Sequence, residues 1–266
     1  MRLLLFLVAV PLWAAEDANT IVQRLIEAAK RNGDRVQPYT YIEEAVHYSY
    51  GKDGALTKHN TLTSEVIFLE GLPFHKLVAR NGRPLPPKEQ AQIERAVRQT
   101  AAERRKQKRP MPGGQIFMNG KTVDVGTNRD LLTVFDVSFA GKEEIRGHKV
   151  WVLDAAPKAG LTPGSEHERE VAGFRRKYWI DEAESLPVRI RYTVSGAGVN
   201  FALPGSFLEI DADKINGDAW LLVALAVEIW QKDGKTTRPG WRTEYTDSQF
   251  QKFDVQSTIT IDHEQR

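Results

Sequence analysis

The stretch from Phe174 to Ser195 places the strongest limit on how this chain folds, because polar and apolar side chains alternate along both of its halves. A period of two puts neighbouring side chains on opposite faces, so each half predicts a half-buried antiparallel strand. The polar residues 182–186 between the halves are few enough to form a hairpin turn. The stretch therefore predicts a two-stranded ribbon with one apolar and one basic face. One set of alternate positions holds Phe174, Arg176, Tyr178 and Ile180 on the first strand and Val188, Ile190, Tyr192 and Val194 on the second.

Segments of the same kind occupy most of the remaining chain and are separated by turn residues such as Asn81-Gly82. The first three follow one another through tight turns, which predicts a meander. Because no linker and no fixed repeat divides the chain, we expect a single domain over residues 16–266. The predicted strands cover residues 39–50, 55–69, 74–80, 133–139, 144–154, 207–215, 219–231, 241–247 and 253–262.

Two segments have the composition or spacing of helices. Ile21, Val22 and Leu25 recur at helical spacing after Asp17 or Asn19 as a cap, and Gly33 is the expected end of this amphipathic helix. Residues 88–109 are rich in Ala, Gln, Glu, Lys and Arg and predict a second helix with few apolar positions. We expect a loop at 110–128 and a short helical turn at 128–132.

The second predicted helix ends in a basic run at residues 104–109. A solvated helix end accounts for such a run, and contact with anionic lipid headgroups or an acidic partner is the alternative. The whole chain carries a formal net charge of only +2, so nothing indicates a nucleic-acid partner.

The N-terminus has the order of a secretory signal. Met1-Arg2 precedes an apolar run from Leu3 to Trp13, and small residues at 14–15 come before acidic ones. We therefore expect a cleavable signal peptide at residues 1–15 and export to the periplasm, with a buried first strand or helix as the alternative. The chain has no cysteine, so it carries neither a disulfide nor a cysteine-linked lipid.

Two of the predicted strands are apolar on both faces rather than on one. They lie at Val150–Leu153 and Ala219–Val227, and both are too short to span a bilayer. A strand of this kind needs apolar material on each side, either as the core of a sandwich or as the wall of a cavity that holds a lipid or acyl chain. Periodicity alone favours the sandwich core.

The sequence contains no recognisable catalytic signature. No G-x-S-x-G elbow, P-loop, G-x-G-x-x-G or cysteine nucleophile is present, and the six histidines are scattered singly. His167 has acidic neighbours but no second histidine at ligand spacing, so we expect neither a metal site nor a cofactor. The adjacent Glu43 and Glu44 point to opposite faces of a strand and cannot act as a pair. We therefore expect a binding protein rather than an enzyme.

Several short motifs resemble the LolA-like outer-membrane lipoprotein-sorting protein family. They lie at residues 131–136, 145–153, 178–181, 186–190 and 245–255. The resemblance implies an incomplete antiparallel β-barrel, or half-barrel, with a concave face lined by hydrophobic side chains and covered by helices that act as a lid. It also implies a lipid or lipoprotein acyl chain as the ligand, and so favours the cavity over the sandwich core.

The resemblance suggests which side chains line such a cavity. The insertion at 86–128 departs from the transport members and leaves open an alternative, an envelope-stress sensor or scaffold that binds a membrane-associated protein partner. In either case we expect a monomer. The candidates for the cavity are Trp151, Leu153, Trp179, Trp220, Leu222 and Phe253.

Overall fold

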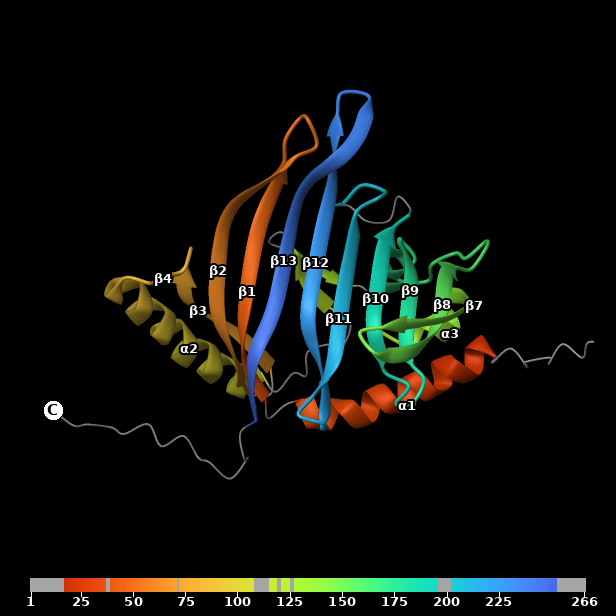
Figure 1. Cartoon of the computed structure of the whole chain (residues 1–266), viewed down its shortest axis with the longest axis horizontal. Helices are drawn as coiled ribbons and strands as arrows, with labels where there is room; N and C mark the ends of the chain where they lie inside the picture. Colours follow the sequence, from red (N-terminus) through yellow and green to blue (C-terminus); the bar gives the residue numbers. More distant parts are fainter. Residues whose placement is uncertain are drawn as a thin grey trace, which may run out of the picture.

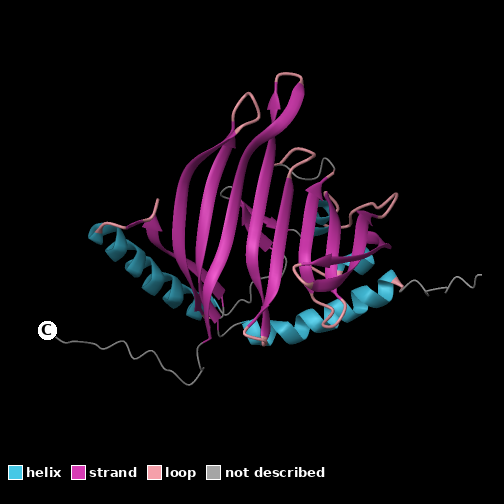
Figure 2. Cartoon of the chain, in the orientation of Figure 1, coloured by secondary structure: helices cyan, strands magenta, loops and turns pink. Residues whose placement is uncertain are grey.

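The computed structural model describes residues 17–36, 39–70, 72–107, 115–118, 121–124, 127–195 and 202–252. The predicted signal peptide and the predicted strand 253–262 lie outside these ranges. Eleven strands form one antiparallel sheet in the order β4-β3-β2-β1-β13-β12-β11-β10-β9-β8-β7, and the two outermost strands do not pair with each other. The sheet is therefore an incomplete barrel, with α1 along its lower end (Figures 1 and 2). No helix of the described residues has the length and apolar character needed to cross a membrane.

The predicted ribbon and meander are confirmed. The ribbon is β9 (Phe174–Asp181) and β10 (Pro187–Val194), and the meander is β1 (Tyr39–Tyr50), β2 (Leu56–Leu69) and β3 (Leu72–Arg80). The other strands of the large sheet are β4 (Arg83–Pro84), β7 (Phe135–Ile145), β8 (His148–Pro157), β11 (Phe207–Ile215), β12 (Ala219–Asp233) and β13 (Thr236–Lys252).

The sheet curves because the register shifts within most of its strand pairs. One extra residue lies on β13 between Ser248 and Gln251 where this strand pairs with β1, and another lies on β7 between Phe139 and Gly141 where it pairs with β8. An extra residue of this kind bends the strand and increases its twist. The sheet therefore has one face that helices can cover and one face that stays on the outside.

Helix α1 (Ala18–Val36) covers one face of β8 and β9. Its first turn is capped by Asp17, whose carboxylate accepts a hydrogen bond from the Thr20 amide at 3.1 Å. Gly33 does not end the helix, contrary to the prediction. The helix continues to Val36 because Arg35 donates to the Asp218 carbonyl at 3.3 Å and Val36 packs against a further apolar cluster.

Helix α2 (Pro87–Gln107) lies against β2 and β3 and is mostly exposed. Its basic end forms hydrogen bonds and an ion pair with residues of β2, β3 and the turn between them, in addition to facing solvent. The Arg104 guanidinium donates to the carbonyls of Leu69, Leu72 and Pro73 at 3.2, 2.7 and 3.1 Å. Arg105 pairs with Glu70 at 2.6 Å. The two arginines therefore fasten the helix to the turn between β2 and β3.

Arg104→Ala is expected to lower the free energy of unfolding by about 1–3 kcal/mol, because three carbonyl oxygens lose a charged donor. Urea denaturation followed by circular dichroism measures the change. Arg98→Ala is the matched control on the same helix, since Arg98 is 62% exposed and reaches Glu94 only at 4.0 Å. The control is expected to cost at most about 0.5 kcal/mol. Equal losses would contradict the assigned role of Arg104.

Two local predictions are corrected by the structure. The expected loop at 110–128 contains a small hairpin of β5 (Gln115–Met118) and β6 (Lys121–Asp124). The expected strand 144–154 is interrupted by a turn at Arg146 and Gly147, both with positive φ, that joins β7 to β8. The connection after β8 contains a short helix, α4 (Glu166–Val171), capped by Ser165. The expected helical turn is α3 (Asp130–Thr133).

Candidate functional site

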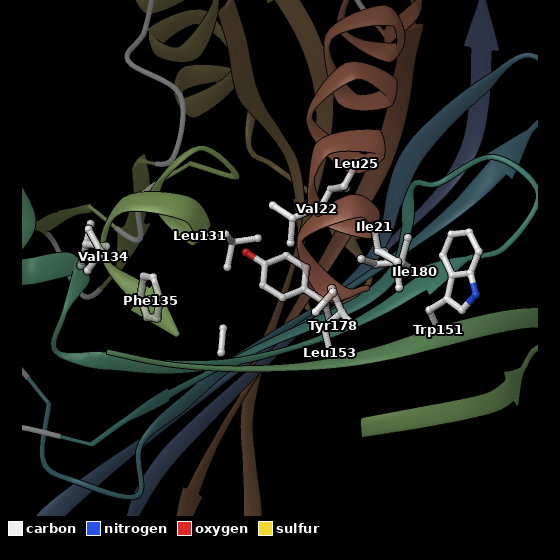
Figure 3. Close-up of a cluster of buried hydrophobic side chains, with 13 residues drawn as sticks. Ile21, Val22, Leu25, Leu131, Val134, Phe135, Trp151, Leu153, Tyr178 and Ile180 are labelled. Atoms are coloured by element: carbon white, nitrogen blue, oxygen red, sulfur yellow. The ribbon is translucent and has the colours of Figure 1, made fainter. Parts of the chain in front are cut away.

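The largest apolar cluster lies between α1, α3, α4 and strands β7 to β9. We call the sheet face that carries it the inner face. Figure 3 shows Ile21, Val22 and Leu25 of α1 directed toward Leu153, Tyr178 and Ile180 of the sheet, with Leu131 beside the Tyr178 ring. Each of these seven side chains is at most 1% exposed. The members of this covered cluster are Ala18, Ile21, Val22, Leu25, Leu131, Val134, Phe135, Trp151, Leu153, Ala155, Val171, Tyr178 and Ile180.

The inner face continues past the covered cluster onto β10, β11, β12 and β13. A second buried cluster lies there and includes Tyr192, Leu208 and Val227. Around it lie side chains that are only half-buried, which we call the inner patch. It spans four strands, or roughly 14 Å at the usual spacing between strands. The inner patch consists of Ile190, Ile210, Leu225, Trp241 and Tyr245.

The strand register shows that the two clusters lie on one continuous face. Arg176 is directly opposite Tyr192, which is opposite Leu208, and Leu208 is in turn opposite Val227. Side chains at directly opposite positions of antiparallel strands lie on the same face. Arg176 therefore lies on the inner face, between the covered cluster and the inner patch.

The structure separates the six cavity candidates. Trp151 and Leu153 belong to the covered cluster, where α1 packs on them. Trp220 belongs to another buried cluster with Ala28 of α1, and its Nε1 donates to Glu184 at 3.1 Å. Leu222 is half-buried opposite Ala212. The last candidate, Phe253, lies outside the described residues.

Trp179 lies on the outer face rather than the inner one. It is opposite Val152, whereas the inner-face residues Trp151 and Ile180 are opposite each other. Its indole Nε1 donates to Glu143 at 2.9 Å, and the Lys177 ammonium lies 5.3 Å from its ring. Trp179 therefore takes no part in the inner patch.

The prediction of strands buried on both faces holds for one of the two. Val150, Trp151, Val152 and Leu153 are each at most 3% exposed. In β12 the residues Ala219 to Leu221 are buried, but those from Leu222 to Ala226 are half-buried. The reason is that the helices cover only the end of β12 that meets α1. The half-buried part of β12 contributes Leu225 to the inner patch.

The outer face of the ribbon is charged but not simply basic. Arg189 donates from Nε and Nη2 to the two carboxylate oxygens of Asp211 at 2.6 and 2.8 Å. Arg191 pairs with Glu209 at 3.4 Å, and Arg146 with Asp211 at 2.7 Å. Acidic side chains of β11 thus neutralise the arginines that the alternation predicted on this face. Where β10 pairs with β11, the ionic side chains lie on the outer face, and the inner-face side chains are apolar or aromatic.

Arg176 departs from this separation. Its side chain is 2% exposed on the inner face, and its Nε and Nη2 have no hydrogen-bond partner. The guanidinium lies 4.2 Å from the Phe135 ring and 5.4 Å from the Tyr192 ring. Burial raises the pKa of the Tyr192 hydroxyl well above its usual range, Tyr178 adds to this rise, and Arg176 opposes it. A buried cation thus lies among aromatic rings beside the hydroxyl of Tyr192.

A second set of polar side chains lies on the inner face, on strands β13, β1 and β3. Asp247 of β13 is opposite Glu43 of β1, and Glu43 accepts a hydrogen bond from His75 of β3 at 2.9 Å. Burial, and then the charge of Glu43, raise the pKa of Asp247 to about 7, while His75 opposes the rise. The hydrogen bond to Glu43 raises the pKa of His75. Periodicity did not predict this group, because Glu43 and Asp247 are far apart along the chain.

Two histidines of the described residues have structural partners. His167 pairs with Asp130 at 3.0 Å and so joins α4 to α3. His148 lies between Asp181 and Asp213 at 3.0 and 3.2 Å. No group of three or more metal-ligating side chains occurs among the residues that the structure describes. The arrangement offers surfaces for binding, namely an apolar patch with a buried cation at one end.

No protein-family model matches the chain, and no curated protein matches its sequence. Solved structures do match it over most of its length. An outer membrane lipoprotein-sorting protein domain from Vibrio parahaemolyticus is 12% identical, with a TM-score of 0.43 over 89% of this chain and 93% of that one. A DUF1329 family protein from Desulfovibrio piger is 13% identical, with a TM-score of 0.36 over 91% of this chain and 95% of that one.

A LolA superfamily protein from Nitrosomonas europaea is also 12% identical, with a TM-score of 0.36 over 91% of this chain and 96% of that one. At this level of identity the likeness concerns the fold alone. Two of these solved structures carry the name of the family that the sequence motifs resemble.

Proposed function

We propose that this protein is an exported binding or carrier protein that holds the acyl chain of a lipid or lipoprotein against the inner patch. The observation that carries the proposal is the half-buried inner patch on β10 to β13, next to a covered cluster of the same face. The apolar signal run at the N-terminus supports export, and the periplasm is the proposed location.

The energetics favour binding over catalysis for such a surface. An acyl chain that leaves a membrane exposes apolar surface at a cost of about 0.8 kcal/mol per CH₂. An apolar sheet face offsets this cost without a covalent step. The side chains of the inner patch pack on buried neighbours, so each is only partly exposed. The exposed part of each side chain remains to contact a ligand.

Leu225→Lys is expected to abolish the lipid that co-purifies with the wild-type protein, because it places an ammonium in the middle of the inner patch. Native mass spectrometry with organic extraction measures the lipid, on protein isolated from the cell envelope. The matched control is Ala226→Lys on the next residue. Ala226 faces outward between Glu209 and Glu244, where a lysine gains two acidic neighbours.

Both variants must keep the wild-type circular dichroism spectrum. Lipid that is lost in Leu225→Lys and retained in Ala226→Lys would support the proposal and identify the ligand. Equal lipid content in both variants would contradict it. A wild-type protein that stays free of lipid after incubation with vesicles would also contradict it and would favour the sensor or scaffold alternative.

A further inference from the structure

Arg176 is a buried cation without a counterion among the described residues. Its three nitrogens have one hydrogen bond between them, from Nη1 to the Thr127 carbonyl at 3.4 Å. An arginine stays protonated at any physiological pH, so it cannot avoid the cost of burial by releasing its proton. A buried charge normally has a paired or hydrogen-bonded partner. Apart from the Thr127 carbonyl, the described protein supplies only the faces of two aromatic rings.

The unused edge of Arg176 is the one that binds oxyanions. In this same protein Arg189 holds both oxygens of Asp211 with its Nε and Nη2. These two N–H groups lie parallel and match the spacing of a carboxylate or phosphate. In Arg176 the same two groups are the ones without partners. Asp211 of β11 thus accepts both hydrogen bonds from Arg189 on the outer face. On the inner face, no described acceptor takes the corresponding two hydrogen bonds from Arg176.

Further polar atoms lie near this edge. Tyr178, two residues along β9, has a fully buried hydroxyl without a hydrogen-bond partner, and Figure 3 shows this hydroxyl directed toward Leu131 of α3. Tyr192 lies directly opposite Arg176 on β10. Buried hydroxyls without partners are rare in folded proteins. The Tyr178 hydroxyl and the Nε–Nη2 edge of Arg176 lie on the same face of β9, and together they indicate a site for a group with several acceptor oxygens.

The position of Arg176 relates this site to the inner patch. The residue opposite it on β8, Ala155, belongs to the covered cluster, and the one opposite it on β10, Tyr192, belongs to the cluster under the inner patch. A ligand with an apolar chain on the patch would therefore have its other end beside Arg176. That end must be acidic to compensate the guanidinium.

We propose that the Nε–Nη2 edge of Arg176 binds the acidic group, carboxylate or phosphate, of the lipid held on the inner patch. This inference rests on the proposed function and narrows its ligand to acidic lipids. The Thr127 carbonyl and the Phe135 ring lie against the guanidinium, so the segment that begins at Thr127 must move aside for entry. It is held by Asp130, which accepts from the Thr127 hydroxyl at 3.0 Å and pairs with His167 of α4.

The test compares two probes with the same chain, oleate and its uncharged ester methyl oleate, on the full-length mature protein. Wild type is expected to bind oleate about 10- to 100-fold more tightly, the range that one or two charge-assisted hydrogen bonds provide. Arg176→Met keeps most of the side-chain volume and removes the charge. It is expected to reduce oleate affinity to that of methyl oleate and to leave methyl oleate unchanged.

Arg175→Met is the matched control, because Arg175 is exposed on the outer face of the same strand. It is expected to change neither affinity. A melting curve without ligand provides a second readout, in which Arg176→Met is expected to melt at a higher temperature, since a buried unpaired charge is removed. A folding defect would instead appear as a lower melting temperature.

The outcomes separate the two proposals. Equal binding of both probes by wild type would overturn the role of Arg176 and keep the lipid-binding function. Binding of neither probe would overturn both. A preference for oleate that persists in Arg176→Met would assign the acidic group to another site. Tight binding of inorganic phosphate alone, lost in Arg176→Met, would reassign the site to a soluble anion.

Discussion

Asp247→Asn is expected to stabilise the folded protein above pH 7 and to remove most of its loss of stability between pH 4 and 7. Asp247 is 6% exposed and faces Glu43 directly, so its ionised form is unfavourable in the fold. Its pKa rises from the usual 3.8 to about 7, first because of burial and then because of Glu43. Asparagine has nearly the same shape and stays neutral at every pH.

The direction in which stability changes with pH follows from proton binding. Between pH 3.8 and about 7 the folded state holds a proton on Asp247 that the unfolded state has released. Stability therefore falls as the pH rises through this window and levels off above it. At about 1.4 kcal/mol per pKa unit, the wild type loses about 2–4 kcal/mol at this group by pH 8. The raised pKa of His75 acts in the same direction, since its pairing with Glu43 weakens as the imidazole loses its proton.

Urea denaturation of wild type and variant at pH 4, 6 and 8 measures the effect. Asp154→Asn, an exposed carboxylate on β8, is the control and is expected to follow the wild-type curve. Tyr41 and Tyr245 also lie close to this group, and the nearby carboxylates raise their pKa values beyond the effect of burial. Parallel curves for wild type and Asp247→Asn would show that Asp247 is ionised in the fold at pH 6.

The strands of the ribbon, the meander and most of the sheet follow from alternation, because burial of one face imposes a period of two on the sequence. The hairpin β5–β6 does not, since two strands of four residues within a Gly- and Pro-rich segment are too short to show a period. The turn at Arg146 and Gly147 had a signal, the glycine, but the apolar residues on either side suggested one continuous strand.

The candidate site was harder to predict than the fold. Alternation placed Arg176 among apolar side chains of β9, and this was the one available sign of the buried cation. Whether Arg176 has hydrogen-bond partners depends on the residues of β8 and β10 that lie beside it. The sequence does not show how these strands pair with β9. The group of Glu43, His75 and Asp247 likewise arises from strand pairings across the sheet. Both groups of side chains are brought together by pairing between strands. Periodicity within one strand does not predict that pairing.

Leu153→Ala is expected to lower the free energy of unfolding by about 2–5 kcal/mol, the range for deleting a fully buried leucine side chain. Leu153 is 0% exposed and lies between α1 and the sheet, in the cluster of Figure 3. The sequence suggested it as a cavity residue, whereas the structure places it where helix packing excludes solvent. Urea denaturation measures the loss.

Asp154→Ala, the next residue and exposed, is the control and is expected to change stability by no more than about 0.5 kcal/mol. A similar small change for Leu153→Ala would mean that solvent reaches Leu153 and that α1 is a lid rather than part of the core. Oleate affinity adds a second comparison. Leu153→Ala is expected to weaken the fold and leave binding unchanged, whereas Leu225→Lys on the inner patch is expected to abolish binding in a folded protein. Opposite effects of this kind would separate the part of the inner face that supports the fold from the part that receives the ligand.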